Sequence, residues 1–380
     1  MIVPKNLKKD IYRSMLEPAY AAGVLRKRLA CYLDYRFANN NTPRFFPESV
    51  TFFLTHRCNL RCRMCGQSKI TNISDELDLK EWKKVVDDIA VFRPNITLYG
   101  GEPFLYKGIE HLVEHIKSKA LHICMITNGT FLDRYAEDMV KNGVDVISVS
   151  IDGPPLIHDQ IRGVSGTFGK IKQGISKINE KKKEYKSKKP LINVVTTISG
   201  SNYLDLGEMV KIASELDITS LNFHHLIFID KDTLRKQNSL CGSDFGKIAQ
   251  DWDGFLSNEI KNIKTDILIK KVEKIKNEKP SFFINFYPNF TSQEIRDYYS
   301  DREFLPQGYK RRCLSPWMTA YVYPDGSVKP CLAVDYTAGL VQEESFSSIW
   351  RNDRFNQFRK KLKKINLFPI CPKCTEFYRY

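Results

Sequence analysis

The feature that most constrains this chain is a group of three closely spaced cysteines. Cys58, Cys62 and Cys65 lie in the stretch THRCNLRCRMCG, directly after an apolar segment. Three thiolates this close together can ligate three irons of one cubane cluster and leave the fourth iron without a protein ligand. An open coordination position admits a reactant, whereas a closed metal site is structural. The spacing therefore predicts a reactive metal centre, with three buried or zinc-bound cysteines as the alternative.

A second group of cysteines lies in the last seventy residues: Cys313, Cys331, Cys371 and Cys374. Four thiolates fill one [4Fe-4S] cluster and leave no open iron. Pro324-Asp325-Gly326 lies between apolar runs and predicts a hairpin turn that brings Cys331 back towards Cys313. We expect a closed site here, and a four-cysteine zinc site is the alternative.

The chain after residue 48 alternates apolar strands with amphipathic helices. The six predicted strands are Ser49–Thr55, Asn95–Gly101, His122–Gly129, Val144–Gly153, Leu191–Ser199 and Ser220–Phe228. The predicted helices include 79–90, 109–119, 166–182 and 204–216. Successive strand-helix units joined by right-handed crossovers form a curved parallel sheet. Six units fall short of the eight of a closed barrel, so the prediction is an α/β fold with an open, partial barrel. Its chemistry should collect at the carboxyl ends of the strands.

The first cysteine group resembles the signature of the radical S-adenosylmethionine (radical SAM) superfamily. In this family a [4Fe-4S] cluster uses its open iron to chelate S-adenosylmethionine. The resemblance implies a partial (β/α)6 barrel and reductive cleavage of S-adenosylmethionine to a 5'-deoxyadenosyl radical. That radical takes a hydrogen atom from the substrate, and an external flavodoxin- or ferredoxin-like protein supplies the electron. The cofactor performs the difficult chemistry, while the protein positions the reacting atoms.

The resemblance also implies which residues bind S-adenosylmethionine. Gly100-Gly101-Glu102 matches the GGE element that meets the methionyl amino group in similar proteins. Polar residues at the ends of the next strands match positions that line the rest of the cofactor: Asn128, Ser150 and Asp152. Arg162, in the following loop, could pair with a carboxylate or form a surface ion pair.

The second cysteine group resembles the SPASM/twitch domain, which implies a fully ligated auxiliary [4Fe-4S] cluster. The chain is then divided into four parts. Residues 1–48 form an N-terminal helical extension, 49–230 the barrel, 231–312 a bridging region rich in helix and aromatics, and 313–380 the small C-terminal iron-sulfur domain.

The substrate is less constrained than the reaction. Maturation of a peptide or natural product is the first hypothesis. A sugar, cyclitol or lipid headgroup is the alternative for a dehydrogenase, epimerase or rearrangement enzyme, and a zinc-stabilised binding protein without catalysis is a third. Cys241, in a loop after the sixth strand, is a candidate hydrogen-atom donor in an epimerase.

The chain carries 59 basic and 44 acidic residues, a net charge of +15 that favours a polyanionic partner. Its basic runs are interspersed with acids and lack stacking aromatics, so we expect no direct action on nucleic acid. The N-terminal stretch with Arg26, Lys27 and Arg28 predicts a helix that packs on the barrel, or one that lies on an anionic membrane. Without a secretory signal we expect a cytoplasmic protein.

Overall fold

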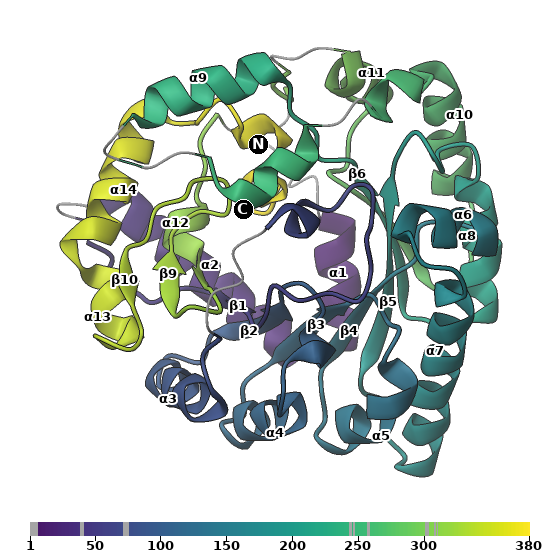
Figure 1. Cartoon of the computed structure of the whole chain (residues 1–380), viewed down its shortest axis with the longest axis horizontal. Helices are drawn as coiled ribbons and strands as arrows, with labels where there is room; N and C mark the ends of the chain where they lie inside the picture. The colour runs from purple at the N-terminus through teal and green to yellow at the C-terminus, as the bar shows by residue number, and fades with distance from the viewer. Residues whose placement is uncertain are drawn as a thin grey trace.

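The protein is built around one ten-stranded sheet (Figure 1). The computed structural model describes residues 7–38, 42–70, 76–242, 245, 248–256, 259–300, 304–307, 309 and 311–380. The strands are β1 (Ser49–Phe53), β2 (Asn95–Tyr99), β3 (Ile123–Thr127), β4 (Val146–Ser150), β5 (Leu191–Ile198), β6 (Ser220–His225), β7 (Phe283–Tyr287), β8 (Thr319–Val322), β9 (Ser327–Lys329) and β10 (Gly339–Leu340). Their order across the sheet is β10-β9-β8-β1-β2-β3-β4-β5-β6-β7.

The six predicted strands form the centre of this sheet, all parallel and in chain order. Two further parallel strands extend it: β7 pairs with β6, and β8 pairs with β1. The sheet therefore runs through three of the four predicted parts of the chain. The strand β8 also pairs antiparallel with β9 through the turn at Pro324-Asp325-Gly326, as the sequence predicted, and Gly326 adopts the positive φ that this turn requires.

Helices pack on the outer face of the sheet between successive strands (Figure 1). They are α3 (Leu79–Ala90), α4 (Ile109–Ser118), α5 (Leu132–Lys141), α6 (Pro155–Arg162), α7 (Thr167–Glu184), α8 (Leu206–Glu215) and, beyond β6, α10 (Thr265–Lys276) and α11 (Ser292–Ser300). The helix α9 (Lys231–Cys241) lies apart from this layer and packs on the C-terminal part (Figure 1). The predicted bounds of α3 are confirmed, because Asp78 and Glu81 form a reciprocal capping box at its start.

The inner face of the sheet is more accessible to solvent than the outer face. Along β5, buried residues alternate with half-buried ones, and β2 and β3 show the same alternation. The buried side chains, such as Ile192 and Val194, belong to the main apolar core, and their half-buried neighbours, such as Asn193, point to the other face. The barrel lumen is therefore lined by half-buried, partly polar side chains.

The two N-terminal helices cover the barrel at the amino ends of its strands. These helices are α1 (Leu7–Leu16) and α2 (Pro18–Phe37). Tyr12 donates to the carbonyl of Thr219, which precedes β6, and Arg28 pairs with Glu48, which precedes β1. These two helices leave the carboxyl ends of the strands uncovered. Among the described residues, no helix is long and apolar enough to cross a bilayer.

The C-terminal part adds short helices beside β8–β10. These are α12 (Ser315–Met318), α13 (Phe346–Arg351), α14 (Asp353–Ile365) and the 3-10 turns η6 (Cys371–Lys373) and η7 (Thr375–Tyr378). Arg359, completely buried on α14, donates to the carbonyls of Pro316 and Trp350 and packs over the ring of Trp350. The guanidinium thereby holds α12, α13 and α14 together.

Candidate active site

The cysteine loop leaves β1 at the carboxyl end of the sheet and is locked against the end of β2. The amide of Gly101 donates to the carbonyl of Thr55 at 2.7 Å, and the amide of Glu102 donates to the carbonyl of Arg57 at 2.8 Å. A Cβ at Gly100 would lie 2.4 Å from the Thr55 carbonyl oxygen, and one at Gly101 would lie 2.2 Å from that of Arg57. Gly100 also has a φ of +134°, which favours glycine. The two glycines are therefore required for the approach of the two segments.

Asn128, at the end of β3, supports the same loop from the other side. Its Nδ2 donates to Asn59 Oδ1 at 2.9 Å and approaches Cys58 Sγ at 3.8 Å. Its Oδ1 accepts from the amide of Thr130, which also binds Asn59. The predicted site residue Asn128 thus lies beside the first cysteine.

Glu102 lies beneath Asn128 and is completely buried. Its Oε1 accepts from the Thr127 hydroxyl at 2.7 Å, and its Oε2 accepts from the Asn128 amide at 2.8 Å. Burial raises the pKa of the carboxyl to about 7, against these hydrogen bonds, which lower it. Both oxygens of Glu102 therefore already accept hydrogen bonds from protein groups at the ends of β2 and β3.

Arg162, the last residue of α6, lies beside the second cysteine. Its Nη1 donates to Cys62 Sγ at 3.6 Å, and its Nη2 pairs with Asp152 Oδ2 at 2.5 Å. Asp152 is completely buried, and its Oδ1 accepts from the amide of Thr197. Arg162 therefore forms an internal ion pair with Asp152 and not a surface ion pair. Burial raises the pKa of Asp152, while the guanidinium opposes that rise.

The loop around α6 is held to the cysteine loop by its backbone as well. The amides of Arg61 and Arg63 donate to the carbonyls of Arg162 and Ile161. His158 Nδ1 accepts from the amide of Asp152 at 3.1 Å, and burial lowers the pKa of this imidazole to about 3. His158 is therefore a neutral acceptor that holds the backbone of Asp152, the partner of Arg162, in place.

Ser150 differs from the other predicted residues because it is half-buried at the end of β4. Together with Tyr99 on β2, it lies on the face of the sheet that turns towards the lumen. Ser150 is thus more accessible than Glu102 and Asp152, whose side chains are completely buried.

The second cysteine group surrounds an enclosed cavity. Cys313, Cys331, Cys371 and Cys374 line it, together with apolar residues and Glu376. Burial raises the pKa of Cys331 to about 12 and raises that of Cys374 well above its ordinary value. Such thiols ionise when a metal takes the place of their protons.

A segment that the sequence did not single out touches both cysteine sites. This 3-10 turn, η4 (Gln250–Phe255), packs on the turn η2 (Gly66–Lys69) that follows Cys65. Gln67 approaches Asp251 at 3.4 Å, and the Trp252 indole donates to the carbonyl of Leu332, next to Cys331. Burial raises the pKa of Asp251 to about 6. No motif marks this segment, and only its tertiary contacts reveal it.

Cys241 lies beside the C-terminal cysteines. It is buried at the end of α9 in the same apolar cluster as Cys313, Cys371 and Cys374, and its Sγ accepts from Gln237 Nε2 at 3.1 Å. Gln237 in turn accepts from the amide of Ile370, beside the cavity. Position in the chain suggested the substrate side, but α9 carries the thiol to the C-terminal cysteine site.

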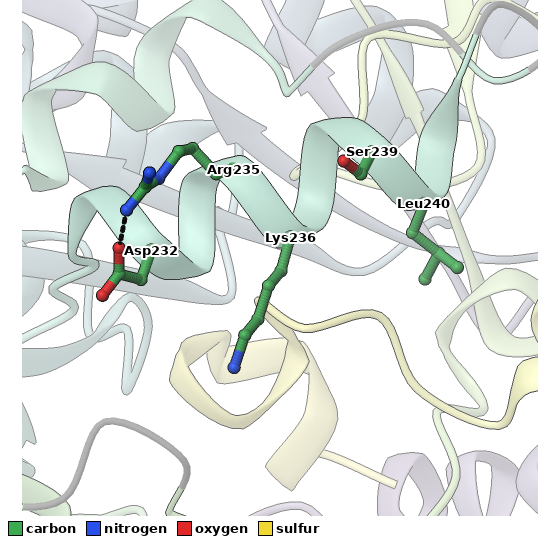
Figure 2. A pocket seen from close by; sticks show the side chains of 5 residues that line it. All are labelled: Asp232, Arg235, Lys236, Ser239 and Leu240. Carbon is green, nitrogen blue, oxygen red and sulfur yellow. Dashed lines mark hydrogen bonds and ion pairs between the residues drawn. The ribbon is translucent and has the colours of Figure 1, made fainter.

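An open pocket of about 600 Å³ runs along α9 (Figure 2). It is lined by Asp232, Arg235, Lys236, Ser239 and Leu240. In Figure 2, Arg235 pairs with Asp232, while the Lys236 side chain extends towards the C-terminal segment. The pocket thus offers both charges on an accessible helix face.

The donor sets of the two cysteine sites fit iron-sulfur clusters. Thiolates are the ligands such clusters require, three where an iron must stay open and four where none does. At the first site the Arg162 guanidinium, which is paired with Asp152, also donates to Cys62, and the second site is an enclosed, mainly apolar cavity. Residues 52–216 match the radical SAM superfamily, and residues 313–375 match the SPASM iron-sulfur cluster-binding domain.

The chain contains a radical SAM domain and a SPASM domain. It is 29% identical over 223 residues to Fe-coproporphyrin III synthase of Methanosarcina barkeri, covering 57% of this chain and 53% of that protein. The chain thus spans about half the length of this relative. It is 25% identical over 360 residues to the sporulation killing factor maturation protein SkfB of Bacillus subtilis, covering 94% of this chain and 76% of SkfB.

Solved structures show the same fold. SuiB of Streptococcus suis bound to S-adenosylmethionine matches with a TM-score of 0.63 at 14% identity, over 98% of this chain and 86% of SuiB. SuiB bound to its precursor peptide SuiA matches with a TM-score of 0.62 at 13% identity, over 84% and 68%. The predicted α/β partial barrel with a C-terminal iron-sulfur domain is confirmed.

Proposed function

We propose that this radical SAM protein is an enzyme that cleaves S-adenosylmethionine reductively and removes a hydrogen atom from a peptide. One observation carries the proposal: a three-cysteine loop is locked against Gly100-Gly101 at the carboxyl end of a barrel with a partly polar lumen. When bound, the cluster and S-adenosylmethionine supply the 5'-deoxyadenosyl radical that takes the hydrogen atom.

The chain's own residues divide into ligands, contacts and positioning groups. Cys58, Cys62 and Cys65 would hold the catalytic cluster. Gly100 and Gly101 let the cysteine loop approach β2, and we propose that their backbone also meets S-adenosylmethionine. Further contacts to S-adenosylmethionine are proposed for Asn128, which lies beside Cys58, and for Ser150, which faces the lumen. Glu102 and Asp152 position their neighbours, since their carboxylates bind protein groups.

The second site would hold a closed [4Fe-4S] cluster. Its four cysteines leave no open iron, so it cannot chelate a substrate and instead accepts or passes an electron. The structure connects it to the catalytic loop through η4, which contacts both. We also propose an external flavodoxin- or ferredoxin-like protein as the source of the electron that starts the reaction.

A peptide is the substrate that the observations favour. The similarity to SkfB, named as a maturation protein, extends over 94% of this chain. SuiB, which shares the fold, has been solved with a precursor peptide. The pocket along α9 is open and bordered by both charges, which suits an extended polar chain.

A porphyrin is the second candidate substrate, because the 29% identity to Fe-coproporphyrin III synthase exceeds the identity to SkfB. That similarity covers little more than half of this chain.

The reaction class is tested by iron content and by formation of 5'-deoxyadenosine. Anaerobically reconstituted protein should hold about eight irons, as two cubanes require. Cys58→Ala should abolish reductive cleavage of S-adenosylmethionine, whereas Cys374→Ala should lose about four irons and retain some cleavage. Colourless protein that binds zinc and forms no 5'-deoxyadenosine would refute the proposal.

The substrate is tested by separate incubations with the reduced enzyme. A short peptide encoded beside the gene should change mass only when S-adenosylmethionine is present, whereas Fe-coproporphyrin III should keep its absorbance spectrum. The reverse pattern would assign the enzyme to porphyrins and leave the reaction class intact.

A further inference from the structure

Helix α2 is apolar on the side that faces solvent as well as on the side that packs on the protein. Its inner side chains, Cys31 and Tyr35, are buried in the core around the C-terminal cysteines. Its outer side carries four large apolar residues at four-residue spacing, which places them in one row on a helix. They are Leu25, Leu29, Leu33 and Phe37, with exposed fractions of 71%, 59%, 36% and 67%. We call this row the α2 stripe.

The α2 stripe cannot turn inward, because α2 is fastened along its length to the barrel and to the C-terminal part. Near the start, the Tyr20 ring stacks on His122 at 3.9 Å between centroids. In the middle, Arg28 pairs with Glu48 at 2.8 Å, and near the end Tyr35 packs edge-on against Trp317. An exposed row of large apolar side chains on a fixed helix marks an interaction surface.

The charges beside the α2 stripe are positive. Arg26 and Arg36 are exposed on the same side of the helix. The acidic residue within α2, Asp34, is turned inward and is almost completely buried, where it accepts from the amide of Phe45. The N-cap residue Glu17 is also buried, paired with Lys189. Along its whole described length, the outer side of α2 therefore shows arginine and no exposed carboxylate.

We propose that α2 docks this enzyme on an anionic membrane surface. A helix with an exposed apolar row and flanking cations lies in the headgroup region, with the apolar side chains inserted and the cations near anionic lipid. A second copy of the chain fits less well, because a two-fold pairing of α2 stripes would bring Arg26 and Arg36 towards their own copies. Since α2 covers the amino ends of the strands, the barrel mouth faces away from the bilayer and stays open to substrate.

Vesicle flotation of the reconstituted enzyme tests this proposal. The probes are vesicles of phosphatidylcholine alone, and vesicles of equal parts phosphatidylcholine and phosphatidylglycerol. The enzyme should float with the anionic vesicles, and added salt should weaken this binding. The double variant Leu25→Glu/Leu29→Glu should bind at least about tenfold more weakly, since two inserted leucines are lost. Arg26→Glu/Arg36→Glu should lose the preference for anionic vesicles.

Leu156→Glu is the matched control, because Leu156 on α6 is 86% exposed and lies outside the α2 stripe. It should float like the wild type. Equal flotation of all variants, or of the enzyme with both vesicle types, would refute the proposal. Dimerisation without lipid that Leu25→Glu/Leu29→Glu abolishes would assign the α2 stripe to self-association instead. Iron content and 5'-deoxyadenosine formation should stay unchanged in every variant, so this result is independent of the proposed chemistry.

Discussion

The buried carboxyl of Glu102 should make the stability of this protein depend on pH in a direction opposite to that of ordinary paired acids. The side chain is completely inaccessible, and burial raises its pKa from 4.5 to about 7. Between these two values the folded chain keeps a proton that the unfolded chain has released. The stabilisation is complete below about pH 4.5 and is lost as the pH rises through 7.

The size of the effect follows from the difference of about 2.5 pH units between the two pKa values. At about 1.4 kcal/mol per unit, the contribution of Glu102 to the free energy of unfolding should fall by about 3 kcal/mol as the pH rises from 4.5 to above 7. His158 and His225 act in the opposite direction, because burial lowers the pKa of each to about 3 and folding then weakens as the pH falls. The total curve therefore mixes both trends.

The difference between wild type and Glu102→Gln isolates the carboxyl. Urea unfolding of the reduced, metal-free protein between pH 5 and 8 should show a wild-type advantage that shrinks by about 2.5 kcal/mol. An amide in this place faces the Asn128 amide donor, so the variant should also lose about 1 kcal/mol at every pH.

Glu208→Gln, on the exposed face of α8, is the control and should leave the curve unchanged. A wild-type advantage of Glu102 that is constant with pH would refute the reasoning, because it would mean that the carboxyl is ionised throughout. An advantage that grows with pH would mean that its hydrogen-bond donors outweigh burial.

Two further substitutions test the geometry of the site. Gly101→Ala places a Cβ 2.2 Å from the Arg57 carbonyl oxygen, so it should destabilise the fold by about 1–3 kcal/mol and release iron from the catalytic site. The control Gly207→Ala meets no atom within 4 Å and should retain all iron. Iron analysis distinguishes the two variants. Arg162→Met leaves Asp152 buried without its cation and should destabilise the fold by about 3–5 kcal/mol in urea unfolding, and Arg162→Lys should recover part of that loss.

The barrel was predictable from sequence because its signals are local. Each of the six strands is a short apolar run bounded by turn residues, and all six are found in chain order. The cysteine loop and Gly100-Gly101 follow their strands directly, so the rule that parallel strands end at one edge was enough to bring them together.

The remaining strands depend on contacts between distant segments. The strand β7 lies in a stretch so rich in aromatic residues that no alternation marks it, and β8 pairs with β1 across some 270 residues. The position of Cys241 was not predictable for the same reason. Its place depends on how α9 packs, and that packing is determined by the C-terminal core rather than by nearby sequence.

These distant contacts give the two cysteine sites a fixed relation. Ser49 on β1 donates to Thr319 on β8, and Arg379 near the C-terminus donates to Ser49. The catalytic loop leaves the carboxyl end of β1, and Cys331 follows the hairpin that begins with β8. Because both strands belong to one hydrogen-bonded sheet, the two sites cannot move apart without breaking it. The C-terminal cysteines are therefore part of the barrel's architecture, and a cluster there is held in register with the site where the substrate would react.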